Sequence, residues 1–237
     1  MRYLIVDDNV QLADNLRELV LEEIEGAHVD VAASGEAAVA LLEDHEYDLF
    51  LTDMRLPGID GDSVVAAIEK RSPGKPVVLI TAHANDDQLV RALDHGAIAV
   101  LQKPIDIPQL LTLIQRWIDP APTVLCIDDE TFLRTNLLEI LHEHLPDVRF
   151  LGAANACAAR RIAENVEVGA AVVDLRLPDD HGSRLARDLK RTCGTQVIGV
   201  TGFREELAEV SGDAFTEVIT KPVPAPHLAA TLQRVLK

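Results

Sequence analysis

Five polar residues that can act together on a phosphoryl group end the apolar runs of this chain, and the set occurs twice. In the first half the set is Asp7, Asp8, Asp53, Thr81 and Lys103. In the second half it is Asp128, Asp129, Asp174, Thr201 and Lys221. Each lysine is followed by a proline, and Arg-Leu-Pro follows both Asp53 and Asp174 at the same distance.

The residue types in each set favour phosphoryl transfer to a carboxylate. Three carboxylates in one cleft repel one another unless a cation joins them, and Mg²⁺ takes oxygen ligands of this kind. A lysine adds a point charge for a phosphoryl oxygen, and a hydroxyl adds a donor. Asp53 and Asp174 are the best nucleophile candidates, because the adjacent aspartate pairs are better placed to hold a metal.

The matched spacing indicates two tandem copies of one domain. The first and second aspartate positions are separated by 46 residues in both halves, from Asp7 to Asp53 and from Asp128 to Asp174. The offset between the copies is 121 at these aspartates, 120 at the threonines and 118 at the lysines. We therefore expect a first domain over residues 1–119, a proline-containing linker over 120–123 and a second domain over 124–237.

Short apolar runs alternate with helical stretches in each copy. In the first copy the runs cover 2–6, 27–32, 48–52, 76–80 and 97–101, and residues 108–118 have a helical apolar period. Asn9 and Ser34 are suited to cap the first two helices. Runs without clean alternation suit parallel strands covered on both faces, so an α/β fold with a doubly wound parallel sheet is expected in each half. In such sheets ligands bind beyond the carboxyl ends of the strands, where all the repeated polar residues lie.

Composition excludes several classes of protein. The 237 residues are 48% hydrophobic and 26% charged, which is typical of a globular chain. A net charge of −17 and only 3% aromatic residues argue against nucleic-acid binding. We expect no membrane association and a cytoplasmic protein, since no apolar run reaches the length of a membrane span and the three cysteines match neither a zinc nor a disulfide pattern.

On these motifs, both halves resemble the receiver domain of two-component response regulators, the CheY-like family. The resemblance implies two flavodoxin-like (βα)5 domains, each with a five-stranded parallel sheet of order 2-1-3-4-5. It also implies that a sensor histidine kinase or a histidine phosphotransfer protein donates a phosphoryl group, with Mg²⁺ as cofactor. Asp53 and Asp174 resemble the phosphoacceptors, and slow loss of the phosphoryl group would be self-catalysed.

The resemblance assigns a role to each remaining residue of the sets. Asp8 and Asp129 resemble the direct metal ligands, Asp7 and Asp128 their companions, and the main-chain carbonyls of Arg55 and Arg176 further ligands. Thr81 and Thr201 resemble the switch hydroxyls, and Lys103 and Lys221 the phosphate-binding lysines. The Lys-Pro bonds resemble the cis peptides of the family.

Three positions depart from the family pattern or vary between the copies. Valines, Val100 and Val218, stand where the family often has a switch aromatic. The arginines two positions after each phosphoacceptor, Arg55 and Arg176, are candidates for setting the lifetime of the acyl phosphate by shaping the access of water. The positions two after the threonines hold His83 and Phe203, of which Phe203 is the one suited to shield its site.

The expected function is that of a signalling module rather than an enzyme. With the chain ending at Lys237 after the second copy, we expect output through phosphorylation-dependent binding of an unidentified protein, and a homodimer is an open alternative. The halves differ in charge: residues 1–120 hold 22 acidic and 9 basic side chains, and residues 121–237 hold 17 and 13. Two rivals are a phosphate sink and a phosphorelay intermediate with one working receiver. A haloacid-dehalogenase-like phosphatase would need D-x-D after the first strand, and a dinucleotide-binding enzyme would need G-x-G-x-x-G; neither pattern is present.

Overall fold

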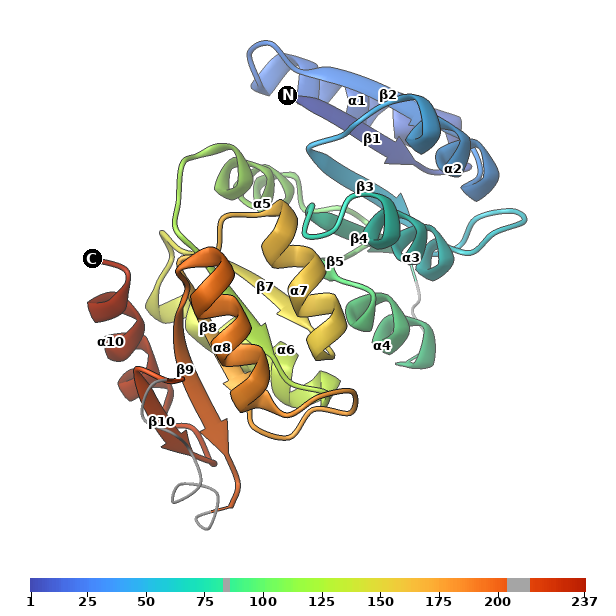
Figure 1. Cartoon of the computed structure of the whole chain (residues 1–237). Coiled ribbons are helices and arrows are strands. Elements are labelled where there is room, and N and C mark those ends of the chain that lie inside the picture. The colour runs from blue at the N-terminus through green and yellow to red at the C-terminus, as the bar shows by residue number, and fades with distance from the viewer. Residues whose placement is uncertain (83–85, 204–213) are drawn as a thin grey trace. The chain divides into compact units, whose positions relative to one another are not determined.

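The chain forms two compact units, Met1–Asp119 and Pro120–Lys237. The computed structural model describes residues 1–82, 86–203 and 214–237. Figure 1 shows the helices and strands of both units.

Unit 1 alternates strands and helices along its whole length. Its strands are β1 (Arg2–Val6), β2 (His28–Ala32), β3 (Leu49–Asp53), β4 (Val77–Thr81) and β5 (Ala97–Gln102). Its helices are α1 (Val10–Glu23), α2 (Gly35–Asp44), α3 (Gly61–Arg71), α4 (Asp86–Asp94) and α5 (Ile107–Ile118). The strands expected from sequence are therefore all present, within one residue at each end.

Unit 2 repeats this alternation. Its strands are β6 (Thr123–Ile127), β7 (Arg149–Ala153), β8 (Ala170–Asp174), β9 (Gln196–Thr201) and β10 (Glu217–Thr220). Its described helices are α6 (Thr131–His144), α7 (Ala156–Asn165), α8 (Gly182–Cys193) and α10 (Ala225–Val235). Strand β6 begins at Thr123, the last residue of the expected linker.

Both sheets are parallel and have the expected strand order. Unit 1 has the order β2-β1-β3-β4-β5, and unit 2 has the same order as β7-β6-β8-β9-β10. The registers match as well, since Ile5 lies beside Leu51 in unit 1 and Cys126 beside Val172 in unit 2. The α/β fold class with two doubly wound sheets is confirmed.

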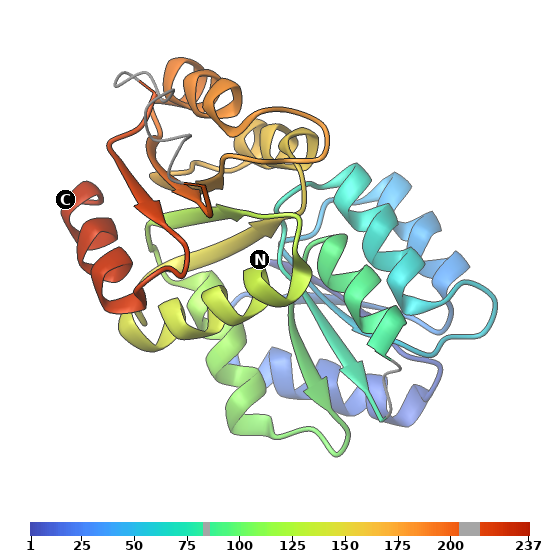
Figure 2. The same ribbon diagram turned by 90° about the horizontal axis from the view of Figure 1, so that it is seen from below.

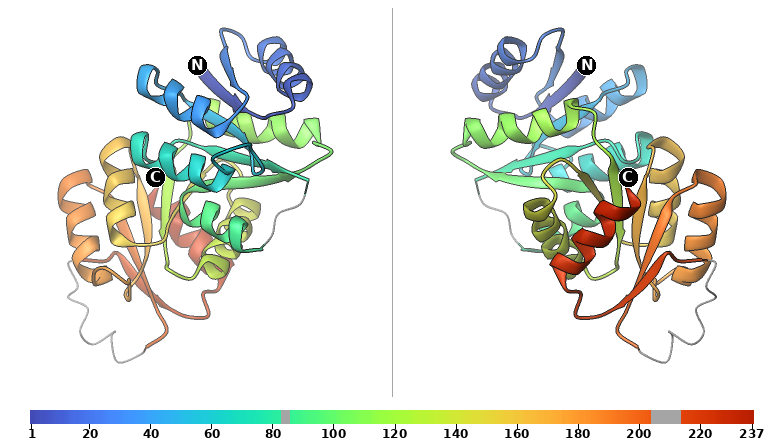
Figure 3. Two further views of the ribbon diagram at one scale, coloured as in Figure 1. Left: turned by 90° about the vertical axis from the view of Figure 1, so that its right-hand side faces the viewer. Right: turned by 90° about the vertical axis from the view of Figure 1, so that its left-hand side faces the viewer.

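Helices cover both faces of each sheet. In unit 1, α1 and α5 lie on one face and α2, α3 and α4 on the other (Figure 2). In unit 2, α6 and α10 lie on one face and α7 and α8 on the other (Figure 3). Burial on both faces explains why the strands read as continuous apolar runs. No helix in the described part of the chain is long and apolar enough to cross a membrane.

Local signals set the helix starts. The side chains of Asn9 and Ser34 accept hydrogen bonds from the main-chain N–H groups of Leu12 and Ala37, so both expected caps are confirmed. Pro108 lies in the first turn of α5, where its missing N–H costs nothing. The bonds Lys103–Pro104 and Lys221–Pro222 are both cis, as expected.

At one pair of matching positions, the two units differ in which position holds the large buried side chain and which the small one. Phe215 is buried and its ring lies over Gly199, where an added Cβ would come 3.0 Å from the ring. The matching positions of unit 1 hold Ala97 and Leu79, both buried in one core cluster. The large side chain has therefore moved from β4 in unit 1 to the residues that precede β10 in unit 2, and the volume of the layer is kept.

Candidate functional site

The repeated polar residues of unit 1 lie at one edge of the sheet. Asp7 directly follows β1, Asp53 ends β3, Thr81 ends β4 and Lys103 directly follows β5. Because all the strands are parallel, these four ends lie at the same edge. The parallel topology of the sheet is therefore sufficient to bring these four residues to one edge.

Lys103 joins two of the carboxylates in unit 1. Its Nζ donates to Asp7 Oδ2 at 2.8 Å and to Asp53 Oδ2 at 2.5 Å. The side chains of Asp7 and Asp53 are almost fully buried, and that of Lys103 is mostly buried. Burial lowers the pKa of Lys103, but the hydrogen bonds to Asp53 and Asp7 outweigh it and leave the pKa above its usual value. The ammonium is therefore charged at neutral pH.

Lys221 does the same in unit 2. Its Nζ donates to Asp128 Oδ2 at 2.8 Å and to Asp174 Oδ2 at 2.7 Å. Here too burial lowers the pKa of the lysine, while the hydrogen bonds to the two aspartates raise it to a net value above normal. We call each group, Lys103 with Asp7 and Asp53 and Lys221 with Asp128 and Asp174, a lysine clamp.

A third carboxylate completes each cluster. Ligand oxygens of Asp7, Asp8 and Asp53 lie within 4.8 Å of one another, and the same holds for Asp128, Asp129 and Asp174. The outer aspartates, Asp8 and Asp129, are exposed. Each cluster has three carboxylates against one ammonium, so it attracts a cation, and its all-oxygen donor set fits a hard divalent ion better than zinc.

Main-chain N–H groups orient the carboxylates that face the lysine. Asp53 Oδ1 accepts from the N–H of Arg55 at 3.0 Å, and Asp174 Oδ1 accepts from the N–H of Arg176 at 3.0 Å. Asp7 Oδ1 accepts from the N–H of Asn9 in the same manner. Each aspartate thus has one oxygen on the lysine and one on the main chain, which fixes its rotamer.

Two glycines let the loop after each phosphoacceptor candidate fold back tightly. A Cβ at Gly61 would lie 2.3 Å from the carbonyl oxygen of Asp53, and one at Gly182 would lie 2.2 Å from that of Asp174. The N–H of Gly61 donates to the carbonyl of Met54 at 2.9 Å. Only a residue without a side chain fits this approach.

The threonines lie at the same sheet edge. Thr81 and Thr201 are almost fully buried, and Thr201 Oγ1 accepts from the N–H of Phe203 at 3.0 Å. Val100 is half-buried and packs on the core cluster beneath α2, α3 and α4, and Val218 is also half-buried. His83 lies outside the described residues.

Sequence reasoning missed three residues around the second clamp. Asp179 accepts from the N–H groups of Ala156 and Cys157 at the start of α7. Arg134 is almost fully buried under α6, and its Nη1 donates to the carbonyl of Asp128 at 2.6 Å. Asp180 accepts from Arg160 at 2.6 Å, which ties the loop after β8 to α7. The adjacent Asp179 and Asp180, which follow Arg-Leu-Pro only in the second copy, were the available signal.

Comparison with known proteins identifies the family. The model of the response regulator receiver domain matches residues 3–115 and again residues 124–233. The chain is 34% identical over 235 residues to the response regulator receiver protein Anae109_2439 of Anaeromyxobacter sp. (strain Fw109-5), covering 99% of this chain and 94% of that protein. It is 33% identical over 116 residues to the DNA-binding transcriptional regulator NtrC of Salmonella typhimurium, a match that spans 24% of NtrC.

Among solved structures, the chain is similar to a CheY-like receiver domain protein from Methanospirillum hungatei JF-1. The identity is 32%, the TM-score is 0.45, and the match covers 48% of this chain and 90% of that one. On the two family matches, the chain belongs to the response regulator receiver family of two-component signalling, with two receiver domains in tandem.

Proposed function

We propose that both units accept a phosphoryl group from a phosphohistidine, on Asp53 and on Asp174, with Mg²⁺ as cofactor. The single observation that carries this proposal is the pair of lysine clamps, in which an ammonium lies 2.5 Å from Asp53 and 2.7 Å from Asp174. Each clamp lies within a cluster of three carboxylates, which supports the cation requirement.

The reaction balances in one displacement. A carboxylate oxygen of Asp53 attacks phosphorus, the P–N bond to the donor histidine breaks, a P–O bond forms, and the imidazole leaves with the electron pair and takes a proton from water. Lys103 already binds the carboxylate of Asp53 and would bind an oxygen of the incoming phosphoryl group. Thr81 ends β4, the strand beside that of Asp53, and its hydroxyl would donate a hydrogen bond to a second phosphoryl oxygen.

The residues that would hold Mg²⁺ are the three carboxylates of each cluster and the main-chain carbonyl of Arg55 or Arg176. When bound, the ion supplies positive charge that offsets the carboxylates and the phosphoryl oxygens. Asp8 and Asp129 are exposed and would take a hydrated ion at the least cost in desolvation.

The test is to treat the full chain with a small acyl phosphate and Mg²⁺ and to measure its intact mass. Two added phosphoryl groups are expected for the native chain, and one for Asp53→Asn or Asp174→Asn. The matched controls Asp44→Asn and Asp147→Asn replace one exposed aspartate in each unit that belongs to neither cluster, and both should still gain two. No gain in mass at either site refutes the proposal.

The same measurement separates the sink or relay alternative. If the native chain gains one phosphoryl group and only one of the two variants gains none, then only one receiver works. The other unit would then serve a different role. We further propose that phosphorylation controls binding to another protein. A pull-down tests that output by comparing the proteins captured by the phosphorylated chain with those captured by the double variant Asp53→Asn, Asp174→Asn. A partner captured equally by both would contradict control by phosphorylation.

A further inference from the structure

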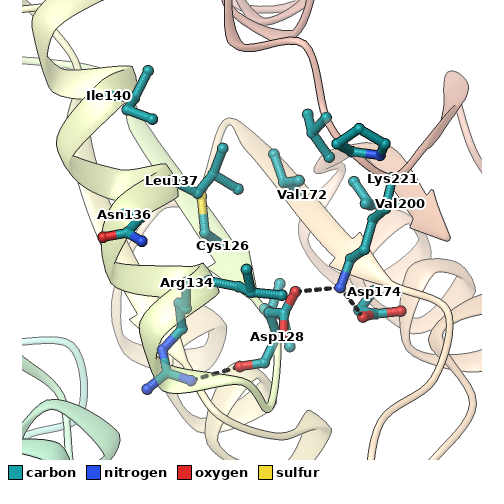
Figure 4. A pocket seen from close by; sticks show the side chains of 14 residues that line it. Cys126, Asp128, Arg134, Asn136, Leu137, Ile140, Val172, Asp174, Val200 and Lys221 are labelled. Atoms are coloured by element: carbon teal, nitrogen blue, oxygen red, sulfur yellow. Dashed lines mark hydrogen bonds and ion pairs between the residues drawn. The ribbon is translucent and has the colours of Figure 1, made fainter. Parts of the chain in front are cut away.

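A pocket of about 470 Å³ lies in unit 2 between helix α6 and the sheet face that it covers (Figure 4). Its wall is aliphatic on both sides, with Leu137 and Ile140 from α6 and Val172 and Val200 from the strands. One end of the pocket is the second lysine clamp, since Asp128, Asp174 and Lys221 line it too. The pocket therefore joins an apolar chamber to the acidic cluster.

The strand side of the pocket is made by small side chains. Unit 1 has Ile5, Leu51 and Ile80 at the positions where unit 2 has Cys126, Val172 and Val200. In both units these three residues lie on the three central strands and are buried. Each exchange removes at least one carbon from the same sheet face, and the losses add because the residues are neighbours.

The helix side differs as well. Arg134 is almost fully buried beneath the first turns of α6, where α1 has Ala13 at the matching position. Gly152 of β7 makes room for it, since a Cβ there would lie 3.3 Å from Arg134 Cδ. Arg134 thus adds a long side chain to the lining of the pocket, where unit 1 has only the methyl group of Ala13.

The chamber is suited to an apolar body. Its size is in the range that takes a small organic molecule. Cys126 lines the strand side of the chamber and is buried, so its thiol adds a small apolar surface there. At the rim, Leu133 and Ile140 are 45% and 40% exposed, so an apolar ligand would cover surface that now faces water.

The charged end of the pocket determines whether a positively or a negatively charged ligand is favoured. Three carboxylates meet two cationic groups at this end: Asp128 and Asp174 line the pocket with Asp129 beside them, and the ammonium of Lys221 and the buried guanidinium of Arg134 line it too. Negative charge is therefore in excess there. A second cation there lowers the repulsion among the carboxylates, and an anion raises it.

We propose that this pocket binds an amphipathic cation, with an aliphatic body between α6 and strands β6, β8 and β9 and an ammonium head on the carboxylates of Asp128 and Asp174. The head and a divalent cation would compete for the same oxygens. Occupancy would therefore suppress phosphorylation of unit 2, a consequence that rests on the proposed function, whereas the binding itself does not.

The experiment titrates the full chain by calorimetry with three probes of one chain length, octylammonium, octanol and octanoate. Octylammonium should bind at least about tenfold more tightly than octanol or octanoate. Millimolar Mg²⁺ should weaken its binding. Equal affinities for the three probes, or no effect of Mg²⁺, would overturn the proposal.

Variants locate the site. The triple substitution Cys126→Ile, Val172→Leu, Val200→Ile installs the side chains of unit 1 and should weaken octylammonium binding at least about tenfold. Val200→Ile alone adds one carbon, is expected to fold, and should weaken binding in the same direction. The control Val166→Ile adds the same carbon at the end of α7, outside the lining of the pocket, and should have no effect. Unchanged binding in both filling variants refutes the site.

Phosphorylation of Asp174 is measured separately by intact mass on the Asp53→Asn chain, in which only unit 2 can gain the group. If octylammonium binds as described but Asp174 never gains a phosphoryl group, the proposed function fails for unit 2 and the pocket stands. If Asp174 is phosphorylated but octylammonium does not bind, the pocket proposal fails alone.

Discussion

The guanidinium of Arg176 stacks on the ring of Phe203, with its Cζ 3.5 Å from the ring centroid. Arg176 comes two residues after Asp174, and Phe203 comes two residues after Thr201. The stack therefore joins the loop after β8 to the loop after β9, at the sheet edge where the second clamp lies. Attraction of this kind is worth about 0.5–1 kcal/mol at an exposed site.

Removing the stack should shorten the lifetime of the acyl phosphate that we propose forms on Asp174. We expect Phe203→Ala and Arg176→Met each to speed its hydrolysis, because water gains access where the two side chains now meet. Decay is followed by intact mass after the phosphodonor is removed, in chains that also carry Asp53→Asn, so that only Asp174 can hold the group. The same substitutions in chains that carry Asp174→Asn are the control, in which decay from Asp53 should not change. Equal decay of Asp174 in native and variant chains would contradict this prediction.

Asp179 should stabilise unit 2 through the start of α7. Its two carboxylate oxygens accept from the N–H groups of Ala156 and Cys157 at 2.9 and 2.8 Å. Asp179→Ala leaves both donors without this partner, and a loss of about 1 kcal/mol in the free energy of unfolding is expected from urea denaturation. The control Glu164→Ala changes an exposed acidic residue of the same helix and should cost less. A loss no larger than that of the control would show that the carboxylate does not act as a cap.

Glu217 gives a pH-dependent part of the stability of unit 2. Burial raises its pKa, but hydrogen bonds from His227, Thr231 and Arg234 outweigh it and hold the pKa below the usual 4.5. A group with a depressed folded pKa stabilises the fold above its unfolded pKa, and this contribution is lost as the pH falls below 4.5. Glu217→Gln should therefore cost about 0.5 kcal/mol at pH 7 and progressively less in acid.

Thermal unfolding from pH 7 down to pH 3 measures that difference. The matched variant Glu167→Gln replaces an exposed glutamate of the same unit, and its difference from the native chain should stay flat with pH. If the stability difference between the native chain and Glu217→Gln grew as the pH fell, the hydrogen bonds to Glu217 would not be the cause.

The pair Gly199 and Phe215 should behave as one packing unit. Phe215→Ala leaves a cavity and should cost about 3 kcal/mol, and Gly199→Leu forces a side chain into the ring and should cost about 1–3 kcal/mol. The double variant restores the arrangement of Leu79 and Ala97 in unit 1 and should recover much of the loss. Additive losses in urea denaturation would show that the two sites are independent.

The sequence predicted the sheets and the position of both clusters, because these depend on period and topology. Apolar runs ending in Asp7, Asp53 or Lys103 define parallel strands, and parallel strands bring their carboxyl ends together whatever the packing between them. The caps at Asn9 and Ser34 were predictable because a cap bonds within three residues of itself.

Features that depend on distant contacts were not predictable. Asp179 bonds to N–H groups 22 and 23 residues away, and nothing local marks it as their partner. The burial of Arg134 contradicts the usual exposure of arginine, and only the smaller residues around it make it feasible. The pocket beside Cys126 results from several single-carbon differences, each of which is unremarkable in sequence.

The close approach of Gly61 to the carbonyl of Asp53, and of Gly182 to that of Asp174, limits how either unit can be redesigned. Even a methyl group there would push on the strand end that carries Asp53 or Asp174, so a substitution far from solvent would re-aim the carboxylate that we propose as phosphoacceptor. Directed-evolution libraries built on this scaffold should keep both positions fixed and place their diversity in the neighbouring loop residues.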